Sequence, residues 1–245
     1  MRPRREGADD NHAEHNSAGT TATQSSRPHR QQRTVVRPRR ACDDVRMSAP
    51  NKHPVLRVTA QEFADGATDD LGDIEIVDGL VVRLMAQSPL HSRVVRRLAG
   101  RLEAARPDGG PCMVVDSDVA ARFPDTDTSA TDRRLNIRYP DIWIRDCEPY
   151  DVNTVRNNLL LVIEVTSEST IDTDISDKRI QYANAGIPRY LIARLDQKEE
   201  RIEEIEDYRL DWSGRRYLVH TVHRRVLLLD DPVEVTIPFD VLEQP

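Results

Sequence analysis

The spacing of apolar residues changes along the chain, and the first change separates a tail from a folded domain. Residues 1–50 consist mainly of Asn, Ser, Thr, Gln, His and Arg, with almost no apolar periodicity. Such a composition cannot bury enough surface to offset the entropy lost on ordering, so it predicts a disordered, basic, low-complexity tail. Apolar periodicity begins near Pro54, and we expect residues 54–245 to form a single folded domain.

Two local signals predict the first elements of that domain. Thr59 and Glu62 have the spacing of a capping box, in which each residue caps the other's backbone, and this predicts a short helix. The segment 73–84 contains two apolar, β-branched runs on either side of Asp78 and Gly79. An Asp-Gly pair between such runs is typical of a type I′ turn and predicts a β-hairpin.

A longer helix is predicted from Ser88, which suits the N-cap, and Pro89, which suits the first helical position. Its apolar residues recur with the helical period and should form a buried stripe: Val94, Val95, Leu98, Leu102 and Ala105. The Pro- and Gly-containing segment 107–110 is expected to end this helix.

The remaining pattern predicts a mixed α/β (α+β) fold. A second helix is expected over residues 173–185, with Gly186 as its left-handed cap, and a strand follows over 189–193. Three strand-like segments lie between the two helices, at 112–122, 136–145 and 159–166. The order from residue 88 is therefore helix-strand-strand-strand-helix-strand. A C-terminal antiparallel extension is expected from segments 199–207, 215–223 and 224–236.

Composition narrows the class of protein. Hydrophobic residues make up 38% of the chain and aromatic residues only 4%, so the core must consist mainly of Val, Leu, Ile and Ala. No apolar run is long enough to span a bilayer, and no secretory signal is recognisable, so no membrane association is expected. The three cysteines are widely spaced and odd in number, which favours neither a disulfide framework nor a zinc cluster: Cys42, Cys112 and Cys147. We expect a cytoplasmic protein.

The distribution of charge is uneven. The net charge is −7, yet the first 46 residues contain more Arg than Asp and Glu, so the domain itself is more acidic than the whole chain. This argues against tight DNA binding without metal but is compatible with carboxylates that bind cations. The basic stretch 27–40 could contact nucleic acid, or it could be a solvated extension without function. Met47 is an alternative translation start.

Two acidic residues in strand-like segments are candidates for a metal site. Asp141 follows Pro140 at the start of one apolar strand, and Glu164 lies inside the apolar run 159–166. A carboxylate in such a strand should be paired or metal-bound, because burying it alone costs several kcal/mol. If the two strands are neighbours, the carboxylates can meet across about 5 Å, which suits a hard divalent cation. Taken alone, Asp141 would more often be an ordinary turn or cap residue.

A lysine is available to complete this site. The chain contains few lysines, and Lys178 lies on the predicted helix that follows the Glu164 strand. Tyr182 is four residues further on and therefore shares its helical face. Lys178 could instead be a solvated residue paired with Asp174.

Together these residues give the chain a resemblance to the Uma2 family (DUF820) of restriction-endonuclease-like proteins, within the PD-(D/E)XK nuclease superfamily. The resemblance extends from about Thr59 to Asp196. The matching residues are Ile74 to Gly79, Ser88-Pro-x-His91, Pro140-Asp141, Glu164-Val-Thr-Ser167, and Asp174-x3-Lys178-x3-Tyr182-x3-Gly186-x3-Tyr190. The combination is specific, whereas each piece alone is weak.

The resemblance implies a restriction-endonuclease-like core over about residues 88–196 and roles for individual residues. Asp141 and Glu164 would hold Mg2+ or Mn2+, and both would be catalytic together with Lys178. In the superfamily motif the lysine stands two positions after the acid, where this chain has Thr166, so the lysine function is assigned to the following helix. Accessory positions are implied for Glu75, His91, Thr166 and Tyr182.

Three hypotheses for function follow. The first is a Mg2+- or Mn2+-dependent endonuclease that hydrolyses phosphodiester bonds of DNA. The second is an inactive nuclease-fold module that binds nucleic acid or a protein partner, which is motivated by the acidic domain and by Thr166 in the lysine position. The third is a homodimer formed through the C-terminal strands.

Overall fold

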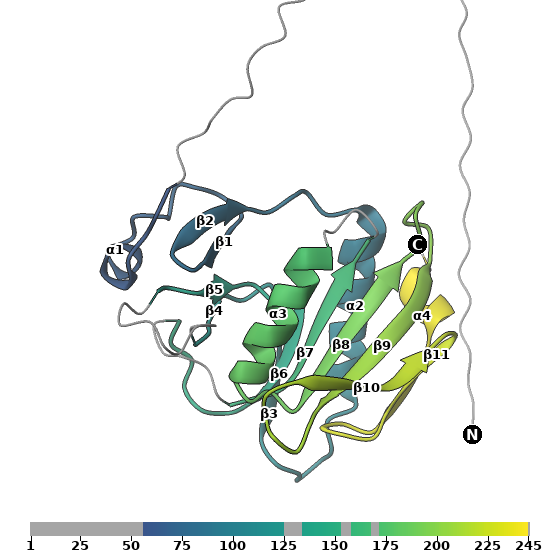
Figure 1. Ribbon diagram of the computed structural model, residues 1–245. Coiled ribbons are helices and arrows are strands. Elements are labelled where there is room, and N and C mark those ends of the chain that lie inside the picture. Colours follow the sequence, from purple (N-terminus) through teal and green to yellow (C-terminus); the bar gives the residue numbers. More distant parts are fainter. Residues whose placement is uncertain (1–55, 125–133, 153–157, 168–171, 245) are drawn as a thin grey trace, which may run out of the picture. The chain divides into compact units, whose positions relative to one another are not determined.

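The computed structural model describes residues 56–124, 134–152, 158–167 and 172–244 (Figure 1). The predicted tail over residues 1–50 lies outside the described residues. None of the helices in the described part of the chain is long and apolar enough to cross a membrane.

Six strands form the larger sheet, in the order β10-β9-β8-β7-β6-β3 (Figure 1). Strands β7 and β8 run parallel, and the other neighbouring pairs of this sheet are antiparallel. A parallel pair needs a crossover connection, which helix α3 (Asp172–Asn184) provides. The bounds of the strands are β3 (Met113–Ser117), β6 (Ile142–Asp146), β7 (Leu159–Thr166), β8 (Arg189–Leu195), β9 (Ile202–Leu210) and β10 (Tyr217–His223).

The two faces of this sheet have separate hydrophobic cores. On β7, Leu161, Ile163 and Val165 pack with α2, whereas Val162 packs in the cluster that includes α3. Because side chains alternate along a strand, Glu164 points to the same face as Val162, under α3. The elements of the α2 face are α2 (Pro89–Ala104), β11 (Val226–Leu229), β12 (Val235–Pro238) and α4 (Phe239–Glu243). Figure 1 shows α3 and α2 on opposite sides of the sheet.

A smaller sheet forms beside the larger one, in the order β2-β1-β5-β4. It has its own apolar cluster, to which Val58, Ile76 and Ile137 belong. Its elements, with the helix that precedes them, are α1 (Ala60–Ala64), β1 (Ile74–Val77), β2 (Leu80–Arg83), β4 (Ala121–Arg122) and β5 (Ile137–Arg138).

Two of the expected strands are each divided between the two sheets, so the prediction of single strands was wrong. The segment 112–122 breaks at Asp118, which has a positive φ of 53°, and continues as β4 in the smaller sheet. The segment 136–145 breaks around Pro140, which separates β5 from β6. Both breaks lie where the chain passes from one sheet to the other, and periodicity alone does not reveal such a change.

Several local predictions are confirmed. The capping box of Thr59 and Glu62 is present, and Ser88 caps α2 through a hydrogen bond from the backbone of His91. The hairpin turn has positive φ at both Asp78 and Gly79, as a type I′ turn requires. The expected stripe of α2 is buried apart from Ala105, which is partly buried beside the core.

The third predicted segment of the C-terminal extension is two short strands rather than one. Strands β11 and β12 pair with each other in a separate two-stranded sheet, and α4, which was not predicted, follows them. Leu227, Ile237 and Leu242 of these elements complete the core beneath α2.

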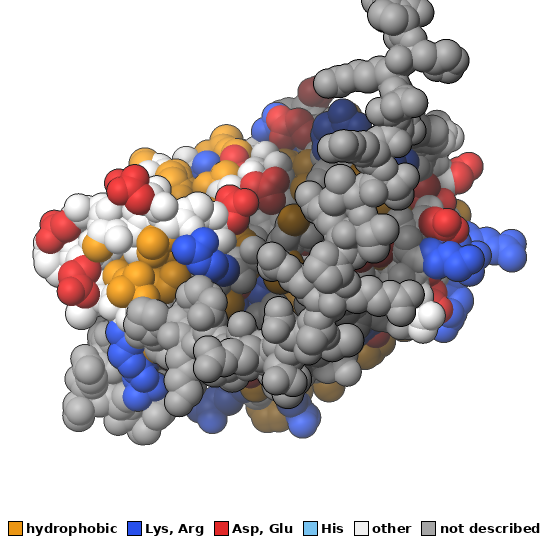
Figure 2. All heavy atoms as spheres, turned by 90° about the horizontal axis from the view of Figure 1, so that it is seen from above, with side chains coloured by type: hydrophobic (Ala, Val, Ile, Leu, Met, Phe, Trp, Pro, Cys, Tyr) orange, Lys and Arg blue, Asp and Glu red, His pale blue; other side chains and the backbone are white. Residues whose placement is uncertain are grey.

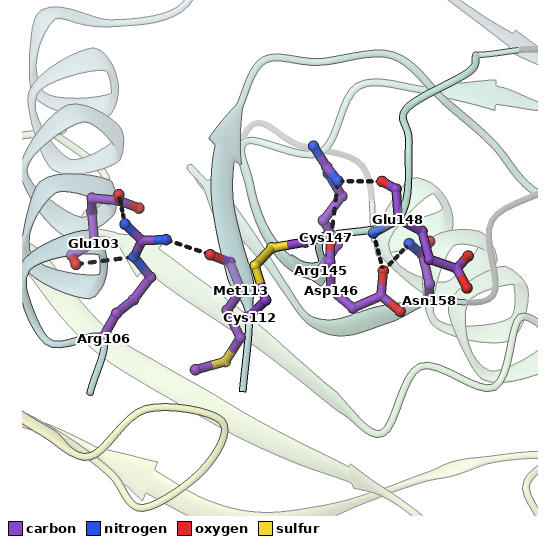
Figure 3. The surroundings of a disulfide bond; sticks show 9 residues. All are labelled: Glu103, Arg106, Cys112, Met113, Arg145, Asp146, Cys147, Glu148 and Asn158. Atoms are coloured by element: carbon purple, nitrogen blue, oxygen red, sulfur yellow. Dashed lines mark hydrogen bonds and ion pairs between the residues drawn. A yellow bond between two sulfur atoms is a disulfide. The ribbon is translucent and has the colours of Figure 1, made fainter. Parts of the chain in front are cut away.

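The structure corrects the prediction that the cysteines form no disulfide. Cys112 and Cys147 are bonded, with their Cα atoms 5.6 Å apart (Figure 3). In the register of β3 with β6, Met113 pairs with Asp146. Cys112 precedes Met113 and Cys147 follows Asp146, so this pairing brings the two cysteines together. Their 35-residue separation in sequence hid this proximity. Cys42 lies outside the described residues.

Candidate active site

Asp141 immediately precedes β6, is 8% exposed, and is held by two neighbouring elements. Its Oδ2 accepts a hydrogen bond from the backbone N–H of Val165 on β7 at 2.6 Å. His91 Nε2 from the first turn of α2 lies 3.2 Å from the same oxygen. Burial alone would lower the pKa of His91, but the hydrogen bond and the charge of Asp141 outweigh it and raise that pKa. Asp141 is therefore a buried residue held from both sides rather than an exposed turn residue.

Glu164 lies on β7 beneath α3 and is 7% exposed. Its Oε2 accepts a hydrogen bond from Lys178 Nζ at 3.1 Å, and its Oε1 accepts one from the Tyr182 hydroxyl at 2.6 Å. The two donors are one helical turn apart, as their spacing predicted. The alternative pairing of Lys178 with Asp174 involves a side chain outside the described ones.

The surroundings of Glu164 disfavour its charged form. Burial raises the pKa of its carboxyl to about 7, and the neighbouring Asp141 and Glu75 add to this, against the opposing effect of Lys178 and Tyr182. Burial, followed by the charge of Asp141, likewise raises the pKa of Asp118 at the end of β3. A cation among these carboxylates would therefore be favoured.

Glu75, one of the implied accessory residues, lies beside two cationic side chains. Its Oε2 accepts a hydrogen bond from Arg138 at 2.7 Å, and its Oε1 lies 3.4 Å from Lys178 Nζ. Arg138 also donates from Nε to Gln181 Oε1 at 2.8 Å. Arg138 and Gln181 are buried site neighbours that the sequence reasoning missed. The one indication in the sequence that Arg138 belongs near the site was its position just before the Pro140-Asp141 pair.

Thr166 and Tyr182, the other accessory candidates, differ in their contacts. Thr166 lies on the same face of β7 as Glu164 by alternation, and its hydroxyl donates to the carbonyl of Ser167 at 3.2 Å. Tyr182 is fully buried, and burial followed by the charge of Glu164 raises its pKa well above the usual range. The phenol therefore remains a hydrogen-bond donor that fixes the Glu164 carboxylate.

The donor set fits a hard cation in kind. Asp141 and Glu164 offer carboxylate oxygens, which Mg2+ and Mn2+ prefer. Within the described ranges, no three His, Cys, Asp or Glu side chains are gathered in metal-ligand geometry. A metal here would thus take two protein carboxylates and complete its coordination with water and substrate, as Mg2+ commonly does.

The described part of the chain is a mixed α/β structure with mostly antiparallel sheets. A cluster of carboxylates and a lysine lies between the larger sheet and helix α3. A similar fold occurs in a putative nuclease belonging to DUF820 from Anabaena variabilis, with a TM-score of 0.51 and 14% sequence identity. The similarity covers 76% of this chain and 97% of that one.

The chain belongs to the Uma2 family, described as "Putative restriction endonuclease", whose family model matches residues 60–239. The matched range spans Asp141, Glu164 and Lys178, and the family match confirms the resemblance seen in the sequence. A comparison with curated proteins gives no match.

Proposed function

We propose that this protein is a Mg2+- or Mn2+-dependent endonuclease that hydrolyses phosphodiester bonds of DNA. The observation that carries the proposal is the contact of Lys178 Nζ with Glu164 at 3.1 Å, on the strand whose Val165 backbone holds Asp141. Membership of a family described as "Putative restriction endonuclease" supports the same reaction.

The two carboxylates would hold the metal. A bound dication supplies Lewis-acid polarisation of the phosphate and lowers the pKa of a bound water. The protein's own contribution is orientation: Tyr182 fixes one oxygen of Glu164, and the Val165 N–H fixes one oxygen of Asp141. His91 contacts that same oxygen of Asp141 and helps to orient the carboxylate, which would hold the metal.

Lys178 would act on the substrate. Its ammonium group lies beside Glu164 and can donate hydrogen bonds to a phosphate oxygen or to the attacking water. Negative charge grows on the phosphate oxygens as the water attacks, and a cation in a largely buried site stabilises this charge strongly.

A cleavage assay tests the proposal. Plasmid and single-stranded DNA are incubated with Mg2+ or Mn2+ and either wild-type protein, Asp141→Ala or Lys178→Ala. We expect the two substitutions to lower the cleavage rate by at least about 100-fold, because each removes an interaction needed in the transition state. Lys198→Ala, at a loop lysine, is the matched control and should cleave like wild type.

Equal activity in all variants would refute the proposed site. The alternative of an inactive nuclease-fold module would be supported if wild-type protein retards DNA in a gel with Mg2+ but leaves it uncut. Robust metal-dependent cleavage that is lost in Glu164→Gln excludes that alternative.

A further inference from the structure

A chain of buried charged and polar groups joins the smaller sheet to helix α3. The smaller sheet contributes Glu75 from β1 and Arg138 from β5, and each is 2% exposed. Helix α3 contributes Lys178 and Gln181, which are 8% and 1% exposed. The contacts run from Gln181 to Arg138, from Arg138 to Glu75, and from Glu75 to Lys178.

Lys178 lies between two buried carboxylates. Its Nζ is 3.1 Å from Glu164 Oε2 and 3.4 Å from Glu75 Oε1, so the two acids compete for one ammonium group. Burial alone would raise the pKa of Glu75, but the charges of Lys178 and Arg138 outweigh it and lower that pKa, so Glu75 is a carboxylate. The position of Lys178 therefore depends on how much of the Glu75 charge another cation neutralises.

Arg138 is the group placed to provide this neutralisation. Its NH1 donates to Glu75 Oε2 at 2.7 Å, which is shorter than the 3.4 Å between Glu75 and Lys178. Gln181 accepts from the Nε of the same guanidinium at 2.8 Å and orients it. Charge-assisted hydrogen bonds of this length are the strong ones in proteins. Glu75 is consequently bound to Arg138 first and to Lys178 second.

We propose that Arg138 is a positioning residue, which neutralises Glu75 and thereby leaves Lys178 directed at Glu164. The catalytic consequence rests on the proposed nuclease function, whereas the placement of Lys178 does not. The smaller sheet thus serves the active site through Arg138, because it delivers both the competing acid and the arginine that neutralises it.

Charge removal and rescue test the proposal. In the metal-dependent cleavage assay, Arg138→Met should lower kcat by about tenfold or more with little change in KM, because Glu75 then attracts Lys178. The double variant Glu75→Gln/Arg138→Met removes both charges and should recover kcat to within about threefold of Glu75→Gln alone. A purely structural role of Arg138 predicts that the double variant is at least as impaired as Arg138→Met, and this result would overturn the proposal.

Arg189 supplies a matched control. It is as buried as Arg138 and pairs with Asp207, on β9 in the larger sheet. The loss caused by Arg189→Met should not be rescued by Glu75→Gln. Rescue there would show that Glu75→Gln is a general stabiliser and would count against the proposal.

A second measurement works without any cleavage activity. The chain has only three lysines, Lys52, Lys178 and Lys198, so Lys52→Arg/Lys198→Arg leaves one signal in an NMR spectrum of 13C-labelled lysine side chains. Arg138→Met should shift the Lys178 Cε signal, and adding Glu75→Gln should move it back toward its original position. An unchanged Lys178 signal in Arg138→Met would overturn the proposal, even if the wild type cleaves DNA.

The conservative variant keeps the test decisive if Arg138→Met does not fold. Arg138→Lys retains the charge and should leave the Lys178 signal close to that of the parent, with folding checked by circular dichroism. Glu164→Gln replaces the partner of Lys178 and sets the scale for a large shift of the Lys178 signal. A shift of that size in Arg138→Lys would contradict a role based on charge. Absence of cleavage in the wild type, with the expected NMR shifts, would instead refute only the nuclease function.

Discussion

Glu164 is buried in a site that stabilises its charged form poorly. Its pKa is raised to about 7 from an ordinary value of 4.5, first by burial and then by Asp141 and Glu75. A carboxyl with a raised pKa in the folded state contributes stability that is complete below pH 4.5 and is lost as the pH rises through 7. Negative charge at this position therefore weakens the metal-free protein at neutral and alkaline pH.

In the absence of metal, we predict that Glu164→Gln gains stability relative to wild type as the pH rises. The variant cannot ionise at this position, so its stability relative to wild type should increase between pH 4.5 and 7 and then level off. Urea unfolding at pH 5 and at pH 8 measures the difference, with exposed Glu234→Gln as the control. Adding Mn2+ should then stabilise the wild type more than the variant. A constant difference at both pH values would contradict the raised pKa.

A second buried acid behaves in the opposite way. Burial alone would raise the pKa of Asp207, but His223 and the two hydrogen bonds from Arg189 outweigh it and hold this pKa at about 2. A carboxyl with a lowered pKa contributes stability that is present above pH 3.8 and is lost as the pH falls through 2.

We therefore predict that Asp207→Asn destabilises the protein most above pH 4. With allowance for solvent screening, the part of the cost that depends on pH should be about 1 to 2 kcal/mol, and it should vanish as the pH falls from 4 to 2. Urea midpoints measured across this range give the difference, and Asp108→Asn on an exposed turn should show none. A cost independent of pH would assign the effect to packing.

Individual residues were predictable where a charge interrupts an apolar pattern. Glu164 stands out because its neighbours on the strand are all apolar, and Lys178 because the chain has few lysines. Arg138 and Gln181 carry no such mark, since an arginine or glutamine in sequence is usually solvated. Their burial follows from the docking of the smaller sheet against α3, which no local pattern encodes.

At the scale of elements, the sequence predicted helix ends better than strand ends. Ser88 caps the start of α2 with its own side-chain oxygen, and Gly186 follows the end of α3 with a positive φ, so both effects are visible locally. The breaks at Asp118 and Pro140 depend on which sheet the next residues join, and that is decided by partners far away in the chain. The disulfide belongs to the same category, because the pairing of β3 with β6 creates it.

The disulfide gives a prediction for the edge of the larger sheet. Strand β3 is the terminal strand, and the cross-link between Cys112 and Cys147 ties it to β6. The double variant Cys112→Ser/Cys147→Ser should lose about 4 kcal/mol, because a loop of this length is no longer closed in the unfolded chain. Urea unfolding measures the loss. Dithiothreitol should destabilise the wild type and leave the variant unchanged; equal stability of the two proteins would contradict a structural cross-link.

At the scale of the whole molecule, the arrangement of charge bears on the proposed binding of DNA. The net charge is −7, and acidic and basic side chains are interspersed on the described part of the face in Figure 2 rather than gathered into one basic patch. At the site itself, burial and then the charges of Asp141 and Asp73 raise the pKa of Asp118. A phosphate approaching these carboxylates is repelled unless a dication lies between them.

DNA affinity should therefore depend on metal even when no cleavage occurs. Lys178→Ala, which keeps both carboxylates, should bind a labelled duplex at least about tenfold more tightly in Mg2+ than in EDTA at constant ionic strength, and Asp141→Ala/Lys178→Ala should lose this gain. Fluorescence anisotropy measures the affinity of each variant for the duplex in Mg2+ and in EDTA. A chain starting at Met47 lacks the Arg-rich segment, so its baseline binding should weaken and depend less on salt, while the gain with Mg2+ persists. Equal affinity in Mg2+ and EDTA would mean that DNA is held by a basic surface elsewhere, and the carboxylate pair would then have no part in binding it.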